Sequence, residues 1–369
     1  MTGPAALAHA LRLHAGSMPV SADFARRHGV EALLAHASGR TDVVAGYEAV
    51  AAIRTRELRR VLDACADAGI QPVVIKGAHL GHVLYASSAL RPHGDVDVVV
   101  APEELDIVAR TVAPLGYDRL PHVRGRLILG QHHFRRIDDL GVPHALDVHW
   151  RIAAPLVFRD VLTAGVLRGR ALPIPALGSH ARGPSLPDAL AIACVHLAAH
   201  HRHDPLLLWL YEIAALAVTL DDVDRRAFLR YAREARLAAI CAWALEQAAR
   251  CFDEEAVAGL IEGLRDRHAV EPSARILKAT RPLDELVLDF SSAGWGERLV
   301  LLREHLCPDA DYMRRTSGAW LPLAYARRAA RGARKWLAAT PTLQTAESDV
   351  PLVDCPEASS SRASAKTSQ

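Results

Sequence analysis

Lysine is the residue this chain has least of among its charged side chains. The 369 residues include 40 arginines but only four lysines, at positions 76, 278, 335 and 366. The lysine at position 76, directly before Gly77, is therefore informative. The compact ammonium of a lysine suits a tight phosphate site, where the wide and planar guanidinium of an arginine would not replace it.

Other absences exclude whole classes of protein. There is no run of about 18 apolar residues, so the sequence predicts neither a membrane span nor a membrane partner. A net charge of only +2 predicts no nucleic-acid partner, because such proteins usually carry a strongly basic face. The six cysteines are scattered without a CxxC pair, and the first residues do not resemble a signal peptide. These features predict a cytoplasmic protein with reduced thiols.

Strand-like patterns are confined to one part of the chain. IQPVVIKG begins at Ile70, DVDVVV begins at Asp95, and ALDVHWRI begins at Ala145. The stretch HHFRRIDDLGVPHALDVHW predicts two strands around an Asp-Asp-Leu-Gly turn. A helix is expected between Pro102 and Gly116. Strand and helix thus alternate through this region.

Helical patterns flank that region on both sides. The serine-capped segment 21–37, the long amphipathic segment that ends at Gly69, and the segment 224–252 all have helical spacing. The expected fold class is α+β, a small mixed β-sheet core with N-terminal helices and a C-terminal helical domain. The expected boundaries are 1–69 for the N-terminal helices, 70–160 for the core, 161–340 for the helical domain and 341–369 for a disordered tail.

Two aspartates lie inside a run of valines. Asp95 and Asp97 share one face of their predicted strand, because side chains alternate, and valines fill the other face. Two ionised carboxylates side by side repel each other unless a cation lies between them. Oxygen ligands of this kind suit Mg²⁺. The alternative is an edge strand on which Asp97 is simply solvated.

The surroundings of the pair decide between these readings. Asp147, between two apolar neighbours on a later predicted strand, is a third carboxylate. Three carboxylates on adjacent strands can hold two metal ions for in-line phosphoryl displacement. Upstream, a strand runs into Lys76 and Gly77, a local shape that lets backbone N–H groups approach a phosphate. The combination favours phosphoryl transfer.

Residues 73–100 resemble the signature of the DNA-polymerase-beta-type nucleotidyltransferase superfamily, in which a glycine motif precedes a pair of acids and a later third acid. The stretches VVIKGAHL, ALRPHGDVDVVV, LGYD and LDVHWRI are similar to an uncharacterised bacterial nucleotidyltransferase family, which is also found in some peptide natural-product clusters. The helical stretch HLAAHHRHDPLLLWLYEIAALA is similar too, and the resemblance covers most of residues 20–335.

The resemblance implies roles for particular residues. Asp95, Asp97 and Asp147 would be catalytic metal ligands, and Asp147 would also help to deprotonate the acceptor hydroxyl. Lys76 and Gly77 would bind the phosphates of the nucleotide. The residue after Gly77 is an alanine where the superfamily has glycine or serine, which leaves more of the phosphate binding to Lys76.

Several basic residues are candidates with competing interpretations. Arg91 lies just before the acids and would either contact nucleotide phosphates or form an ion pair with the sheet. Arg136 and Arg151 are weaker candidates for positive charge near a triphosphate. His133 has no partner that the sequence identifies.

Three further histidines are candidates for the acceptor site or for contacts behind the acids. His149 follows Asp147 by two residues on the same predicted face, where it would orient Asp147, contact the acceptor or be a satisfied core histidine. His196 and His200 stand four residues apart in HLAAHHRHD. They would line the cleft or bond within the helical domain, and a zinc site is the rival interpretation.

The predicted function is transfer of a nucleoside monophosphate from a nucleoside triphosphate such as ATP, with two Mg²⁺ ions. The acceptor would be a hydroxyl or phosphate of a small molecule or peptide, as in natural-product biosynthesis. Three alternatives remain open from the residues alone. They are a degenerate nucleotide-binding or regulatory module, transfer of another phosphate-linked group, and a histidine-based metallohydrolase.

Overall fold

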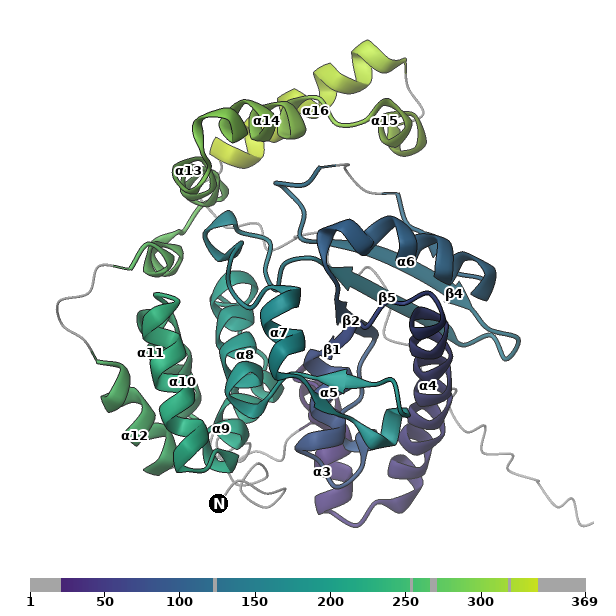
Figure 1. Cartoon of the computed structure of the whole chain (residues 1–369), viewed down its shortest axis with the longest axis vertical. Helices are drawn as coiled ribbons and strands as arrows, with labels where there is room; N and C mark the ends of the chain where they lie inside the picture. The colour runs from purple at the N-terminus through teal and green to yellow at the C-terminus, as the bar shows by residue number, and fades with distance from the viewer. Residues whose placement is uncertain (1–20, 122–124, 253–254, 266–270, 318–319, 338–369) are drawn as a thin grey trace, which may run out of the picture.

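The computed structural model describes residues 21–121, 125–252, 255–265, 271–317 and 320–337. It is an α+β protein, as expected, in which helices surround one mixed seven-stranded sheet (Figure 1). The expected tail 341–369 and the first residues of the expected N-terminal helical region lie outside the described residues. The strands are β1 (Val73–Ile75), β2 (Asp95–Val99), β3 (Asp118–Arg119), β4 (Gln131–Ile137), β5 (Pro143–His149), β6 (Leu172–Pro173) and β7 (Arg182–Gly183).

The helices fall into three groups along the chain. Before and within the sheet region they are α2 (Ala22–Arg27), α3 (Glu31–Ala37), α4 (Thr41–Asp67), α5 (Lys76–Val83), α6 (Leu105–Val112) and α7 (Ala164–Arg170). The next group is α8 (Leu186–His200), α9 (Leu207–Thr219), α10 (Asp222–Glu234), α11 (Ala238–Ala249) and α12 (Glu255–Leu264). The last is α13 (Pro282–Ser292), α14 (Trp295–Leu306), α15 (Ala310–Ser317) and α16 (Leu321–Leu337), which lies at the top of Figure 1.

The sheet has the order β3-β4-β5-β2-β1-β7-β6. Its central strand β2 pairs in parallel with β5 and antiparallel with β1. Strands β4 and β5 form the predicted hairpin around the turn that begins at Asp138. The acids predicted on β2 and β5 therefore lie on neighbouring strands at the middle of the sheet, and not on a solvated edge.

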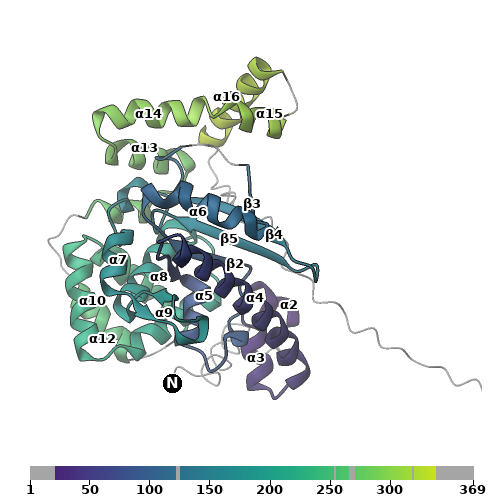
Figure 2. The same ribbon diagram turned by 45° about the vertical axis from the view of Figure 1, so that its right-hand side comes forward.

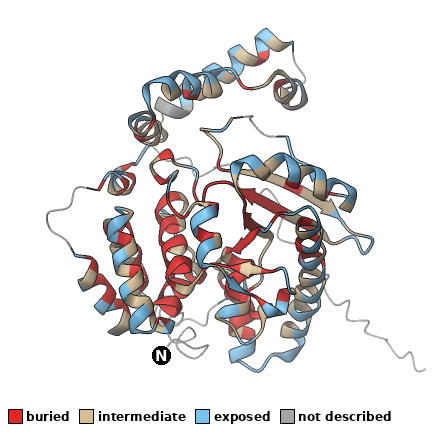
Figure 3. Ribbon diagram, viewed as in Figure 1, coloured by how far each residue is buried: buried red, intermediate tan, exposed pale blue. Residues whose placement is uncertain are grey.

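The two faces of the sheet pack against different helices (Figure 2). Val98 of β2 and Val148 of β5 point into a core with α4 and α6. Val73 of β1 and Val99 of β2 point into a larger core that contains α8, α9 and α11. The buried residues in Figure 3 follow this division, with the central strands and α8 mostly buried. The alternation predicted for β2 is confirmed, since Val96, Val98 and Val100 share the α4 face.

Two segments that the sequence pattern predicts to be helical are each split by a residue with positive φ. Segment 21–37 divides into α2 and α3 at Gly29, which has φ +69° and lies against Leu208 of α9. Segment 224–252 divides into α10 and α11 at Arg236, which has φ +57°. Apolar periodicity continues across both breaks, so the pattern cannot reveal them. At each break the chain changes direction, so that the helices before and after it can both pack against the rest of the protein.

The second unexpected feature is at the edge of the sheet beside β1. Residues 172–183, predicted to lie in a helical region, form β6 and β7, and β7 pairs in parallel with β1 at Val73. Both strands are two residues long. Strands this short have no alternation for a sequence pattern to detect. Among the described residues, no helix is long and apolar enough to cross a membrane.

His79 of α5 is a buried histidine that should make the fold sensitive to acid. Its side chain is 2% exposed, and within the described part of the chain its Nδ1 has no hydrogen-bond partner. Burial, and then the neighbouring His82, lower the pKa of His79 from 6.5 to about 4. A depressed histidine pKa means that stability present above pH 6.5 is lost as the pH falls through about 4.

We therefore expect the free energy of unfolding to fall by up to about 3 kcal/mol between those two pH values. A His79→Met variant should show a flatter dependence, because methionine does not titrate. Urea denaturation at a series of pH values measures both slopes. An unchanged slope in the variant would assign the acid sensitivity to other groups.

Candidate active site

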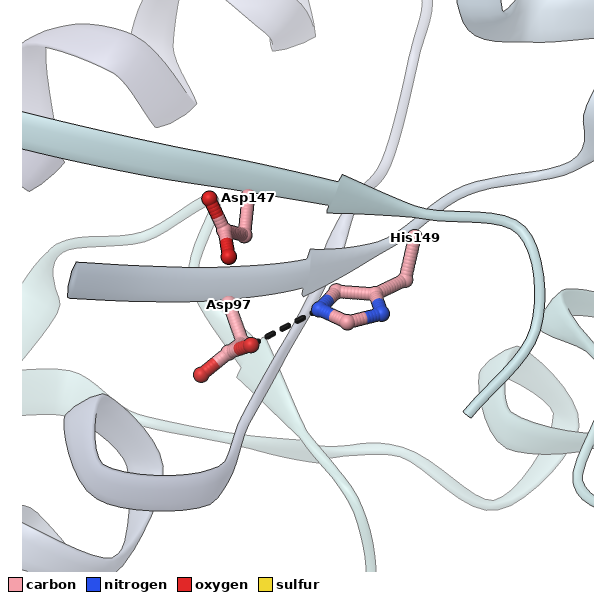
Figure 4. Close-up of side chains that lie close together, drawn as sticks. All are labelled: Asp97, Asp147 and His149. Carbon is pink, nitrogen blue, oxygen red and sulfur yellow. Dashed lines mark hydrogen bonds and ion pairs between the residues drawn. The ribbon is translucent and has the colours of Figure 1, made fainter. Parts of the chain in front are cut away.

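The centre of the site is the pair Asp97 and Asp147, which stand directly opposite each other on β2 and β5 (Figure 4). The Oδ1 atom of Asp97 accepts hydrogen bonds from Lys76 Nζ at 2.8 Å and from His149 Nε2 at 2.7 Å. Burial alone would raise the pKa of Asp97, but the Lys76 ammonium and the His149 hydrogen bond outweigh it and hold this pKa well below its ordinary value. Asp97 is therefore a buried, ionised carboxylate that is stabilised by cationic and hydrogen-bonding partners.

Lys76 reaches Asp97 from an unusual backbone position. It is the first residue of α5, directly after β1, and it has φ +52°, which is rare for a residue with a side chain. Ile75 is paired with Asp97 across the β1–β2 ladder, so the strand brings the lysine next to the acid. A left-handed residue held by surrounding structure is typical of functional turns. The predicted strand-to-helix turn at Lys76 and Gly77 is therefore present.

Asp95 differs from Asp97 in that its carboxylate has no side-chain partner among the described residues. It is half-buried, and its carboxylate makes no hydrogen bond or ion pair with any side chain of the described residues. Burial, followed by the charges of Asp97 and Asp147, raises the pKa of Asp95 from 3.8 to about 7. An unpaired carboxylate with a raised pKa, beside two others, is an arrangement that a bound cation would relieve.

Asp147 is held by two residues that sequence reasoning did not assign to the site. His133 Nδ1 lies 2.8 Å from Asp147 Oδ1, and Gln131 Nε2 donates to Asp147 Oδ2 at 3.1 Å. Gln131 Nε2 also lies 3.3 Å from His133 Nε2, so the imidazole would accept there and donate from Nδ1. The alternation of β4 carries the missed signal, since residues 131 and 133 share a face and pair with β5.

The arrangement fits a divalent cation. Asp97, Asp147 and His149 each offer one ligand atom, and these three atoms lie within 4.8 Å of one another. All three residues are buried, and the two carboxylates provide the hard oxygen ligands that Mg²⁺ prefers. His149 lies on the same face as Asp147, as the alternation predicts, but its Nε2 hydrogen-bonds Asp97 and not Asp147. Asp95 lies on the same strand and the same face as Asp97, but it is not part of this group of three.

Arg91 is engaged by a carboxylate from the helical region. Its Nε donates to Glu212 Oε1 at 2.6 Å and its Nη2 to Oε2 at 3.3 Å, and both side chains are almost fully buried. The structure thus shows an ion pair, the second of the two interpretations, although the partner belongs to α9 and not to the sheet. A Cβ atom at Gly77 would lie 2.9 Å from Arg91 Nη1, so this glycine makes room for the guanidinium.

His196 and His200 lie on α8 in an aromatic cluster. The two imidazole centroids are 5.6 Å apart, and His196 packs edge-on against Trp209 at 5.6 Å. Burial, and then the nearby Lys76 ammonium, hold the pKa of His196 well below its ordinary value, so this imidazole is neutral. The cluster therefore borders the site on its α8 side. The group of potential metal ligands found among the described residues contains neither histidine.

Arg54 of α4 is a further cation that the sequence does not reveal. It lines two small hollows, one with His93 and Asp95 and the other with Gly77 and Ala78. Burial lowers the pKa of Arg54, and the Asp95 carboxylate opposes this shift. No acidic side chain in the described part of the chain forms an ion pair with Arg54. A single arginine on an amphipathic helix has no sequence signal that would link it to the acids.

Comparisons with known proteins place this chain in a family. A family model described as an uncharacterised nucleotidyltransferase matches residues 21–253, well over half of the chain. No curated protein matches the chain. Among solved structures, the chain is similar to JHP933 from Helicobacter pylori, with 14% sequence identity and a TM-score of 0.32, over 68% of this chain and 97% of that one. By the family match, this chain belongs to the uncharacterised nucleotidyltransferase family.

Proposed function

We propose that this protein is a Mg²⁺-dependent nucleotidyltransferase of the DNA-polymerase-beta type. It would transfer a nucleoside monophosphate from a nucleoside triphosphate to a hydroxyl or phosphate of a small molecule or peptide. The observation that carries this proposal is the pairing of Asp97 with Asp147 on neighbouring strands, with Asp95 unpaired beside them and Lys76 at the start of α5. A role in natural-product biosynthesis follows from the resemblance of the motifs and belongs to the same proposal.

The residues divide into a triphosphate side and a metal side. Lys76 and the backbone N–H groups at the start of α5 would bind the triphosphate, because a helix N-terminus favours negative charge. Asp95, Asp97 and Asp147 would hold two Mg²⁺ ions, with His149 bonded to Asp97 behind them. When bound, the metal ions would supply neutralisation of the charge that develops on the phosphate oxygens.

The chain's own contribution to the chemistry is mainly positioning. His133 and Gln131 fix the Asp147 carboxylate, so that its orientation is set before substrates bind. The Asp147 carboxylate would accept the proton of an acceptor hydroxyl or orient that hydroxyl for attack on the α-phosphorus. Lys76, whose ammonium hydrogen-bonds Asp97, would stabilise the negative charge of the departing pyrophosphate.

Transfer of another phosphate-linked group from an activated donor uses the same residues and is the second candidate. The alanine at position 78, where the superfamily has glycine or serine, favours it, because the usual hydroxyl or second glycine for the triphosphate is missing. A degenerate nucleotide-binding module is disfavoured by the retention of all three acids around one point.

Calorimetric titration of the four nucleoside triphosphates, with and without Mg²⁺, tests the proposal directly. We expect Mg²⁺-dependent binding of at least one triphosphate by the wild type. An Asp95→Asn/Asp97→Asn variant should lose that dependence, because the two negative charges that favour the metal are removed and only neutral amide oxygens remain. The preferred base would be identified in the same experiment.

The matched control is Asp106→Asn, which removes an exposed carboxylate on α6 outside the site. It should bind as the wild type does. Binding of a nucleotide sugar or another activated donor in place of every simple triphosphate would support the second candidate. Retention of full Mg²⁺-dependent binding by the folded double variant would show that the metal assignment is wrong.

A further inference from the structure

The register of the sheet places an arginine on the same face as the three acids. Arg135 of β4 pairs with Ala145 of β5, which in turn pairs with Asp95 of β2. Residues directly opposite each other point to the same face, so Arg135, Ala145 and Asp95 form one row across the sheet. Neighbouring strands lie about 4.8 Å apart, so Arg135 is about 10 Å from Asp95 between Cα atoms, with only a methyl side chain between them.

Arg135 differs from its sequence neighbour Arg136 in forming no ion pair with any described residue. Arg136 points to the opposite face and donates to Glu57 of α4 at 2.9 Å. Arg135 forms no ion pair with any acidic side chain of the described residues, and its Nε is buried without a hydrogen-bond partner. The side chain as a whole is half-buried. Asp118 of β3 stands opposite Arg135 on the same face but forms no ion pair with it. A guanidinium kept partly out of water without an ion pair is unfavourable, which points to an anion that is supplied from outside the chain.

The position of Arg135 indicates that the anion would bind on the β4 side of the three acids. Lys76 lies on the β1 side of Asp97, whereas Arg135 lies on the β4 side, beyond Asp147. Resting on the proposed function, the triphosphate occupies the Lys76 side. In-line displacement requires the attacking group to approach the phosphorus opposite the departing pyrophosphate. The acceptor therefore approaches over β5 and β4, where Arg135 is an arginine that forms no ion pair with any described residue.

We propose that Arg135 binds an oxyanion of the acceptor, so that the acceptor of this enzyme carries a phosphate or carboxylate group. The planar fork of an arginine matches both groups through paired N–H···O hydrogen bonds. Gln131 and His133, the other two polar β4 residues on this face, are already committed to Asp147. Arg135 thus selects the acceptor, while Lys76 binds the donor.

Binding of inorganic phosphate and of acetate to the full chain tests this proposal without a known acceptor. Titrations are followed by calorimetry, for wild type and Arg135→Gln, in the presence of Mg²⁺ and a saturating non-hydrolysable triphosphate analogue. Loss of a charge-assisted arginine pair should weaken oxyanion binding by about tenfold or more. The affinity of the triphosphate analogue should not change. Arg110→Gln, which removes an exposed arginine on α6, is the matched control.

The same titrations in a Lys76→Gln variant test this proposal independently of the proposed function. This substitution removes the rival phosphate site at Lys76. Oxyanion binding that persists there and is lost on adding Arg135→Gln supports the inference even if no triphosphate binds. Preference for phosphate or for acetate identifies which oxyanion the acceptor carries. The proposal for Arg135 would be overturned if the wild type and a folded Arg135→Gln variant bound oxyanions equally, or if neither bound them. Thermal unfolding checks that each variant is folded.

Discussion

The Asp95→Asn variant is expected to show a rate of nucleotidyl transfer that is lower by about 10³-fold or more. A loss of this size corresponds to the several kcal/mol by which a catalytic metal ion stabilises the transition state. The same variant should unfold at a higher temperature than the wild type at pH 8 without metal. Burial and the charges of Asp97 and Asp147 raise the pKa of Asp95 to about 7, so at pH 8 its ionised form opposes folding. Asparagine has the same shape and no charge, and it removes that repulsion.

The sign of the stability change depends on pH. A carboxyl group whose pKa is raised on folding contributes stability that is fully present below its unfolded pKa, near 3.8, and is lost as the pH rises through about 7. We therefore expect the free energy of unfolding of Asp95→Asn to exceed that of the wild type by about 1–2 kcal/mol at pH 8, after allowance for solvent screening. The difference should vanish near pH 4. Thermal unfolding at both pH values measures it.

Asp97→Asn is the contrasting variant. Asp97→Asn keeps an acceptor oxygen but removes the negative charge that offsets the half-buried Lys76 ammonium and bonds His149, so this variant should lose both activity and stability. A gain of stability in Asp95→Asn would show that the Asp95 carboxylate serves ligand binding at the expense of the fold. A loss of stability in Asp97→Asn would show that the Asp97 carboxylate also supports the fold. Full activity of a folded Asp95→Asn variant would show that Asp95 is not a metal ligand.

Short-range periodicity was sufficient to predict which side chains share a face. Alternation along DVDVVV and ALDVHWRI places Asp95 with Asp97 and Asp147 with His149, and the structure has both pairs on one face. The helical segments were also predictable, because their apolar spacing extends over several turns. The grouping of the three acids was therefore predictable from local patterns and the motif resemblance together.

The partners of these residues were not predictable in the same way. Arg91 and Glu212 are 121 positions apart, and no local pattern joins them. The partner of His133 was within reach, because the turn that begins at Asp138 fixes the hairpin register that places His133 opposite Asp147. Strand order is a tertiary property, so the position of β2 between β5 and β1 required the structure.

The Glu212→Gln variant is expected to lose about 3–5 kcal/mol of unfolding free energy, because it leaves the buried Arg91 charge without compensation. Glu212 is 3% exposed and Arg91 8% exposed, and Tyr85 also donates to Glu212 Oε1 at 3.2 Å. Burial would lower the pKa of Arg91, but the Glu212 carboxylate outweighs this and raises it. Urea denaturation of Glu212→Gln beside the exposed control Glu262→Gln measures the difference, and the control should change by less than about 1 kcal/mol.

The double variant Arg91→Met/Glu212→Leu decides between the two roles of Arg91. Replacement of both charges by apolar side chains should recover most of the lost stability, because neither charge is then buried alone. Triphosphate binding should be retained in the double variant, since the guanidinium is committed to Glu212 and to the Pro92 carbonyl. Loss of triphosphate binding from a double variant that melts like the wild type would instead make Arg91 a phosphate ligand.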